Sequence, residues 1–498
     1  MEDILGNIGP ALNIVFQFET FLVIALGVLA GVILGILPGF GGSQALALMF
    51  PFTFIMSPSA AILFMISIYS AAEYGGSIPA ILIRTPGTTA AAMTVLDGYP
   101  MAQKGDAYRA LMISITSGVF GGIFSSLIFI VAATALAWVG LQFGPSEMFA
   151  LGLLGLAIIG SFVGNNPTKG FIAAGLGLLL STFGESPFGA VRFSFDLDFL
   201  SDGIPLIVMI IAMLAAPEIF RLMGLTRADD EASIEGSKGM LSGRGKGFSF
   251  FDFRKLLPTM LRGSLIGTFI GAIPGPGPTV GTVIAYNEEK RWSKRADQFG
   301  TGIDEAVSAP ESANNAVVAG AMVPALALGI PGSGAIAVLL GVLVSKNMVP
   351  GPTLFTENGP LVMAVFIGLI ICNIFLLLCG ILGIRYFAKI VEVPGRILGP
   401  FVMVMLIIGA YAHDNNVAHA GMVIVFGALA FWMDKFNFST IPVILGFVMG
   451  PIIEQNLNLA MVINQGNVIS MVSRPLTIFI LTLSVITAYA AYRRSKKI

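Results

Sequence analysis

Hydroxyl side chains follow a Pro-Gly pair at two places inside long apolar stretches. The first is Arg84-Thr85-Pro86-Gly87-Thr88-Thr89, and the second is Ile330-Pro331-Gly332-Ser333-Gly334. Proline and glycine interrupt a helix, so the hydroxyl residues are expected to cap a new half-helix. The positive dipole end of that half-helix suits a carboxylate. The unwound carbonyls and hydroxyls beside it suit a hard cation such as sodium.

Two of these features have a second interpretation. Capping alone would explain Thr88, Thr89 and Ser333, although a capping residue can still contact a ligand. The guanidinium group of Arg84 could hold a carboxylate in a bidentate way. It could also reach toward the membrane interface along an apolar stem, which is the favoured interpretation. Gly329 occupies the matching position in the second stretch, so that stretch has no equivalent arginine.

A cluster of uncharged polar residues leads into another apolar run at Ala309-Pro310-Glu311-Ser312-Ala313-Asn314-Asn315-Ala316. An asparagine amide can donate to a carboxylate, and its carbonyl oxygen can bind a cation. A loop ending in a helix cap would explain Asn314 and Asn315 equally well. Glu311 suits an ion ligand or, as the favoured interpretation, a first-turn charge stabilised by the helix dipole. We expect the sodium ligands to include Thr89, Asn314 and Ser333.

The elements that position these residues belong to a membrane protein. Of 498 residues, 56% are hydrophobic and 11% are charged, and the mean hydropathy is +0.89. Soluble domains carry roughly 25% charged residues, so soluble enzymes and nucleic-acid binders are excluded. At about 20 apolar residues per crossing, the chain allows about ten to thirteen hydrophobic passages, some of them re-entrant or broken. No nucleophile, phosphate-loop or zinc motif occurs, so we expect neither an enzyme nor a cofactor beyond a coupling ion.

The apolar runs form two series that share motifs. GVLAGVILGILPGFGG from Gly27 aligns with GSLIGTFIGAIPGPGP from Gly263, and GGSIPAILIRTPGTTAAA from Gly75 aligns with GAMVPALALGIPGSGAIA from Gly320. A weaker pair aligns 164–166 with 414–416. Glycines four residues apart predict a smooth ridge for close helix packing. The solute-binding breaks are therefore expected to include both copies of the first motif: Pro38, Gly39 and Gly41 with Pro274, Gly275 and Gly277. A positive φ is expected at Gly39, Gly87, Gly275 and Gly332.

The distribution of basic residues indicates a linker between the two series of apolar runs. Eight basic residues lie between Arg221 and Arg262, and none precedes Arg84. Since Lys and Arg in short loops stay cytoplasmic, the linker and C-terminus should be cytoplasmic and the N-terminus periplasmic. The expected organisation is a transmembrane repeat at 1–225, a linker at 226–255, and a second repeat with its tail at 256–498. The copies then have inverted topology, with an all-α polytopic fold and alternating access around a midplane site at the repeat interface.

Several of these motifs together resemble a known family. LPGFGG, YGGSIPAIL with TPG and DGYPMAQKG, IPGPGP, ESANNA followed by GIPGSG, and VPGP are similar to the large membrane subunit of bacterial tripartite tricarboxylate transporters. The resemblance covers nearly the whole chain, and its most specific part is the stretch at 309–334.

The resemblance implies a permease in the bacterial inner membrane, partnered by a small membrane subunit and a periplasmic solute-binding protein. It implies secondary, sodium-coupled import of tricarboxylates, dicarboxylates or aromatic acids. A stand-alone secondary transporter or channel that needs no partner subunit remains the alternative.

Overall fold

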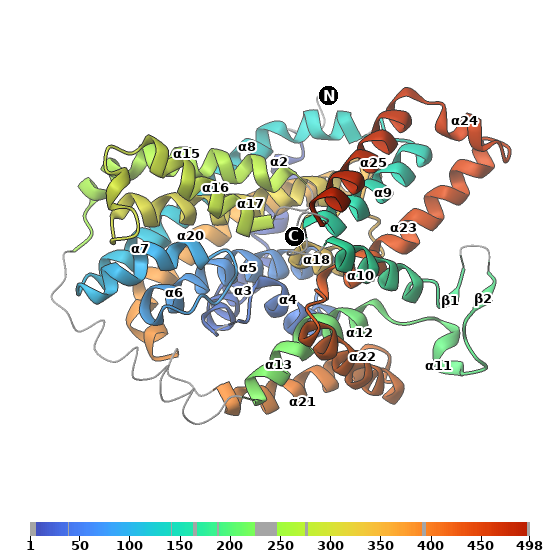
Figure 1. Ribbon diagram of the computed structural model, residues 1–498, viewed down its shortest axis with the longest axis horizontal. Helices are drawn as coiled ribbons and strands as arrows, with labels where there is room; N and C mark the ends of the chain where they lie inside the picture. Colours follow the sequence, from blue (N-terminus) through green and yellow to red (C-terminus); the bar gives the residue numbers. More distant parts are fainter. Residues whose placement is uncertain are drawn as a thin grey trace. The chain divides into compact units, whose positions relative to one another are not determined.

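The computed structural model describes residues 6–37, 39–140, 142–162, 167–186, 189–224, 247–273, 277–390 and 395–495 (Figure 1). The predicted site residues Pro38, Pro274 and Gly275 lie outside these ranges, as do 164–166 and most of the predicted linker. Within them the chain is almost entirely helical, apart from one two-stranded hairpin. The expected all-α class is therefore confirmed.

The chain forms two compact units, and each takes segments from both halves of the sequence. The first unit comprises Met1–Thr134, Glu218–Val323 and Asn358–Val402, and the second comprises Ala135–Pro217, Pro324–Glu357 and Met403–Ile498. Helices α8, α13, α17 and α21 contribute residues to both units.

The first unit contains most of the elements that this article concerns. They are α2 (Ile8–Val15), α3 (Phe18–Ile36), α4 (Gly42–Met49), the 3-10 turn η1 (Phe50–Ile55), α5 (Pro58–Gly75), α6 (Ser77–Ile83), α7 (Ala92–Gln103), α8 (Ala107–Gly140), α13 (Ala216–Met223), α15 (Phe250–Ala272), α16 (Gly277–Trp292), η3 (Ala296–Gln298), α17 (Asp304–Leu328) and α20 (Gly359–Ile390).

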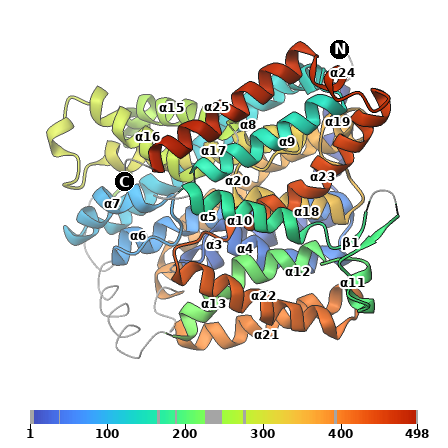
Figure 2. The ribbon, with the colours of Figure 1, turned by 45° about the vertical axis from the view of Figure 1, so that its right-hand side comes forward.

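In the second unit, α9, α10, α23 and α25 pack together (Figure 2). Its elements are α9 (Pro145–Phe162), α10 (Pro167–Leu180), β1 (Gly184–Glu185), β2 (Val191–Arg192), α11 (Asp198–Ser201), α12 (Leu206–Ile210), the π-turn η2 (Ile211–Ala215), α18 (Gly334–Ser345), α19 (Pro352–Glu357), α21 (Gly395–Asp414), α22 (Val417–Lys435), α23 (Ile441–Ile463), α24 (Val468–Val472) and α25 (Pro475–Ser495).

Seven described helical segments are long and apolar enough to cross a membrane. They are Phe18–Ile36, Pro58–Ile83, Ala107–Ala132, Leu206–Met223, Gly359–Ile384, Val417–Lys435 and Ile441–Ile463. Six shorter apolar helical segments accompany them. Together they make a multi-pass membrane protein. Helix α17 is not among them, because it carries acidic and amide side chains, yet almost all of it is buried.

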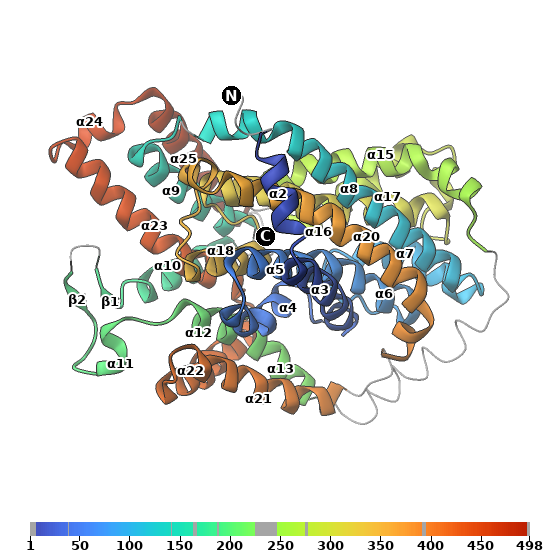
Figure 3. The ribbon, with the colours of Figure 1, turned by 180° about the vertical axis from the view of Figure 1, so that it is seen from behind.

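The predicted glycine ridge exists and packs α3 against α5 (Figure 3). A Cβ atom on Gly27 would lie 2.8 Å from the carbonyl oxygen of Phe64, and one on Gly31 would lie 2.8 Å from the Cβ of Ala71. The backbones therefore approach more closely than any larger residue allows, as expected for small residues on a helix interface in lipid.

The second copy of the motif packs in the same way. In α15, Gly267 faces Ala313 of α17, and a Cβ on Gly271 would lie 2.9 Å from the Cα of Gly320. In the first copy, a Cβ on Gly75 would lie 3.1 Å from the Cα of Gly35. Gly35 and Gly75 are the sequence equivalents of Gly271 and Gly320, so two aligned pairs of segments make the same contact.

The predicted positive φ is correct at Gly39, where φ is 77°, but wrong at Gly87 and Gly332. The left-handed residues at those breaks are instead the aligned Arg84 (φ 61°) and Gly329 (φ 67°). The amide of Thr85 donates to Pro79 O at 3.3 Å, and that of Ile330 donates to Pro324 O at 3.2 Å. Both helices thus end through the same backbone geometry, before the Pro-Gly pair is reached.

Candidate functional site

Two helix breaks, one from each half of the sequence, meet in the first unit. The Thr89 hydroxyl lies in the break between α6 and α7, and it is hydrogen-bonded to the hydroxyl of Thr279, in the first turn of α16, at 2.7 Å. Thr89 is exposed and Thr279 is half-buried. The contact therefore joins the breaks at an accessible position.

The loop between α6 and α7 lies directly on the backbone of neighbouring segments. The Gly87 amide donates to Gly76 O at 2.9 Å, and a Cβ on Gly87 would collide with the carbonyl oxygen of Gly35. The next residue, Thr88, lies beside Gly76 and Gly41. Gly87 is thus required for close backbone approach rather than for a left-handed conformation.

Helices α7 and α16 begin at these breaks, at Ala92 and Gly277, and α4 begins at Gly42 after a third break, whose Gly41 lies beside Thr88. None has an acidic residue in its first turn. Helix α7 starts later than expected, because Thr88 and Thr89 form a turn before it. The Thr88 hydroxyl accepts from the Ala91 amide at 3.3 Å. These helix starts combine free N–H groups with positive dipole ends, which is the arrangement that proteins use to bind anions.

Behind the breaks, three hydroxyl groups converge on the buried carboxylate of Glu311. Ser77 of α6 donates to Oε1 at 2.6 Å, Thr94 of α7 donates to the same oxygen, and Ser114 of α8 donates to Oε2 at 2.9 Å. Glu311 is only 2% exposed and the three hydroxyl residues are buried. Residues far apart in sequence therefore form one oxygen-rich site.

One turn along α17, several buried polar atoms have no hydrogen-bond partner. The Asn314 amide nitrogen donates to Glu73 O at 3.3 Å, but Asn314 Oδ1, Asn315 Nδ2 and Glu73 Oε2 are unpaired. The side chain of Thr88 contacts the Glu73 carboxyl group, which links these atoms to the break. Buried polar groups are normally satisfied, so these unpaired atoms make this position a candidate ligand site.

Comparison with known proteins identifies the chain's family. Residues 21–445 match the family model of the tripartite tricarboxylate transporter TctA family. The chain belongs to the TctA family. It is also 33% identical, over all of its length and 98% of the relative's, to an uncharacterized 52.8 kDa protein in the TAR-I ttuC' 3'region of Agrobacterium vitis. An uncharacterized protein in the TAR-II ttuC' 3'region of the same organism is 32% identical over 45% of the chain and 93% of that protein. No solved structure matches.

TctA proteins are a transporter family, the large permease subunit of tripartite tricarboxylate transporters. The matched residues include both breaks of the first unit and the buried polar residues behind them. They end inside α23, so α24 and α25 lie outside the family match.

The remaining predicted site residues of this TctA chain are more scattered. Arg84 is exposed, at the end of α6. Ser333 caps α18 by accepting from the Ile336 amide at 3.3 Å, as predicted. With Pro331, Gly332 and Gly334 it belongs to the second unit, whereas Thr89 and Asn314 belong to the first. Sodium binding by Thr89, Asn314 and Ser333 stays a prediction.

The favoured interpretation of Glu311 as a first-turn helix charge is wrong. Helix α17 begins at Asp304, so Glu311 lies two turns inside it. The sequence did contain a signal, since Glu311, Asn314 and Asn315 are spaced i, i+3 and i+4 and therefore share one helix face. Ser77, Thr94 and Ser114 could not be found in this way, because only the tertiary fold brings their helices together.

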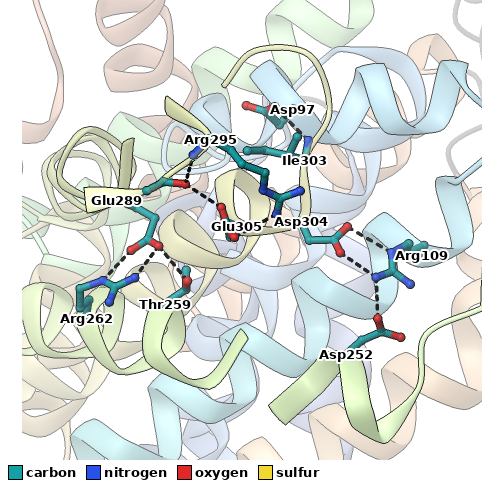
Figure 4. Close-up of polar contacts among 11 residues, drawn as sticks. Asp97, Arg109, Asp252, Thr259, Arg262, Glu289, Arg295, Ile303, Asp304 and Glu305 are labelled. Atoms are coloured by element: carbon teal, nitrogen blue, oxygen red, sulfur yellow. Dashed lines mark hydrogen bonds and ion pairs between the residues drawn. The ribbon is translucent and has the colours of Figure 1, made fainter. Parts of the chain in front are cut away.

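A network of ion pairs holds the helices around the site (Figure 4). Arg109 of α8 binds Asp304 of α17 at 2.6 Å and Asp252 of α15 at 2.9 Å. The hydrogen bonds from Arg109, helped by Ser249, hold the pKa of Asp252 well below its usual range. Arg262 of α15 forms two hydrogen bonds with the buried Glu289 of α16, at 2.6 and 2.8 Å.

Asp97 of α7 anchors the loop that precedes α17. It is fully buried and accepts hydrogen bonds from the Tyr286 hydroxyl at 2.8 Å and from the amides of Gly300, Gly302 and Ile303 at 2.8 to 3.2 Å. These contacts fix α7, α16 and α17 to one another. Thr94 and Glu311 lie on two of these helices, so their relative position depends on this anchor.

Proposed function

We propose that the chain is the permease subunit of a binding-protein-dependent secondary importer of organic carboxylates, coupled to sodium. The solute class covers tricarboxylates, dicarboxylates and aromatic acids, and the chain resides in the bacterial inner membrane. The observation that carries the proposal is the Thr89–Thr279 contact within a TctA-family chain. It brings the loop between α6 and α7, from the first half, and the start of α16, from the second half, together at one accessible position.

The local chemistry supports an anionic solute at this position. Helices α7 and α16 begin there, and α4 follows Gly41, which lies beside Thr88. None has an acidic first-turn residue, and their N–H groups favour negative charge. Thr88 and Thr89 add hydroxyl donors. The exposed Arg84 stands at the end of α6, at the start of the same loop, and can supply a bidentate partner for a carboxylate.

Alternating access is proposed to arise from an inverted repeat. The matched Gly35–Gly75 and Gly271–Gly320 contacts and the matched left-handed residues Arg84 and Gly329 support duplication. The predicted cytoplasmic position of the linker supplies the inversion. A reporter on the linker should be cytoplasmic and one on the N-terminus periplasmic, and finding both on one side contradicts the inverted repeat.

The partner requirement is tested by reconstitution. We reconstitute the chain and the small membrane subunit into proteoliposomes and add the solute-binding protein. Uptake of a radiolabelled carboxylate is measured with and without a sodium gradient, and each component is omitted in turn. We expect uptake only with all three components and an inward gradient. Full uptake by this chain alone would support a stand-alone transporter instead.

A further inference from the structure

Glu311 has neither a positive partner nor backbone amide donors among the described residues, whereas most other buried acidic residues have one or the other. Glu289 is paired with Arg262, and in the second unit Glu147 is paired with Arg474 at 3.2 Å. Asp97 accepts from three backbone amides and a tyrosine. Glu311 has only three neutral hydroxyl donors and no ion pair within the described residues. An ionised carboxylate buried in this way carries a large desolvation cost unless a cation neutralises it.

The oxygen atoms gathered at this site suit a small metal cation. Two carboxylate oxygens and the hydroxyls of Ser77, Thr94 and Ser114 present five oxygen atoms from four helices, α6, α7, α8 and α17. Hard cations take about six oxygen ligands, and a hydroxyl that now donates to Glu311 can rotate to offer a lone pair to an ion. A proton on Glu311 would need only one oxygen. We propose that Glu311, Ser77, Thr94 and Ser114 form a sodium site of this transporter.

The next turn of α17 provides an independent indication of a cation. Asn314 Oδ1 and Glu73 Oε2 are acceptor atoms, both residues are at least 95% buried, and neither atom has a partner. Unpaired acceptors in a buried region call for a donor or a positive ion. The site at Glu311 lies on the same face of α17, so a sodium ion there lowers the negative potential of the whole cluster.

This proposal rests on the proposed function for its role in transport. Thr88 connects the Glu73 carboxyl group to the break where the carboxylate solute is placed. Without a cation, Glu73 and Glu311 repel an anionic solute. With sodium bound, that repulsion falls, so sodium should bind first and raise the affinity for solute. The coupling is reciprocal, so bound solute should also raise the affinity for sodium.

The experiment measures sodium binding to the purified full-length chain, without any solute. The midpoint of thermal unfolding is recorded against NaCl, with choline chloride and KCl at matched ionic strength, because an ion that binds the folded state raises stability in a saturable way. The variants are Glu311→Gln and Ser114→Ala. The matched control is Ser126→Ala, which removes a buried hydroxyl from the same helix. That hydroxyl donates to Gly122 O, at 2.8 Å, and does not contact Glu311.

We expect a saturable, sodium-specific rise in the wild type that is absent in Glu311→Gln. The apparent sodium dissociation constant should rise about 5- to 10-fold in Ser114→Ala, the effect of one lost interaction, and should be unchanged in Ser126→Ala. An unchanged constant in both Glu311→Gln and Ser114→Ala overturns the proposal. A wild-type unfolding midpoint that responds to acidification but not to sodium also overturns the proposal, if Glu311→Gln removes that response. The neighbouring titratable groups are Glu73 and Tyr74.

Uptake separates this proposal from the proposed function. Sodium-dependent uptake that survives in Glu311→Gln would leave the importer assignment intact and remove the site. The opposite outcome is that Glu311→Gln abolishes sodium binding but the wild-type chain, with its partners, imports no carboxylate. That outcome would support the sodium site and contradict the importer assignment.

Discussion

Replacing Gly35 by alanine tests how tightly the first break is built. The new Cβ would lie 2.8 Å from the Cα of Ala72 and against the carbonyl oxygen of the same residue. Ordinary carbon contacts are about 3.5 to 4.0 Å, so α3 and α5 must separate by about 1 Å. Both neighbouring atoms belong to the backbone, so no side chain can rotate away.

The expected cost can be estimated from these contacts. Overpacking of this kind costs about 1–3 kcal/mol, and alanine regains about 0.5–1 kcal/mol of helix preference over glycine. We expect a net destabilisation of about 1–2 kcal/mol. Gly175→Ala in α10 is the control, because a Cβ there has no neighbour within 4 Å. It should be neutral or stabilising by about 0.5–1 kcal/mol.

The assay compares the thermal unfolding midpoints of the two variants, and then their uptake rates at a temperature where both are folded. Gly35→Ala should unfold at a lower temperature than the wild type and Gly175→Ala should not. Uptake should fall in Gly35→Ala alone, because the Gly35 carbonyl oxygen lies where a Cβ on Gly87 would be. Equal midpoints for the two variants would refute the packing argument.

Three further predictions concern residues around the breaks. Arg84→Gly relieves a left-handed residue at φ 61°, a cost of about 1–2 kcal/mol. Stability should therefore not fall, and a large loss of uptake would assign the guanidinium group to the solute. Asp97→Asn should destabilise by roughly 1–3 kcal/mol for each buried amide left unpaired, with faster hydrogen exchange at Gly300 and Gly302. The depressed pKa of Asp252 contributes stability above its unfolded pKa of about 4, which is lost as pH falls further. The stability difference between wild type and Asp252→Asn should therefore be constant from neutral pH down to about pH 5 and vanish in strong acid.

Local sequence patterns predicted the parts of the fold that depend on local physics. Glycines at 27, 31 and 35 marked a packing ridge because four-residue spacing places them on one helix face, and α3 packs through them. Ser333 was recognised as a cap because a hydroxyl residue just before a helix can accept from the first free amides.

Features that depend on tertiary contacts could not be predicted. Gly87 looked like a left-handed residue, but Arg84 takes that conformation and Gly87 is needed for the approach of Gly35 and Gly76. Glu311 lies inside α17 because that helix begins at Asp304. The hydropathy of the sequence does not indicate this helix start. Its three hydroxyl partners come from helices that meet only in the folded chain.

The central claim is that the breaks and the buried polar residues behind them, Asn314 and Asn315 included, bind what this transporter moves. It is tested most directly by uptake measured against sodium concentration, at fixed binding protein and solute, for the wild type, Asn314→Ala and Asn315→Ala. Losing one amide contact to the bound species costs about 1–3 kcal/mol, so we expect a roughly 5- to 150-fold loss of apparent affinity. Curves for both variants that overlay the wild type would contradict the account and place the binding site elsewhere.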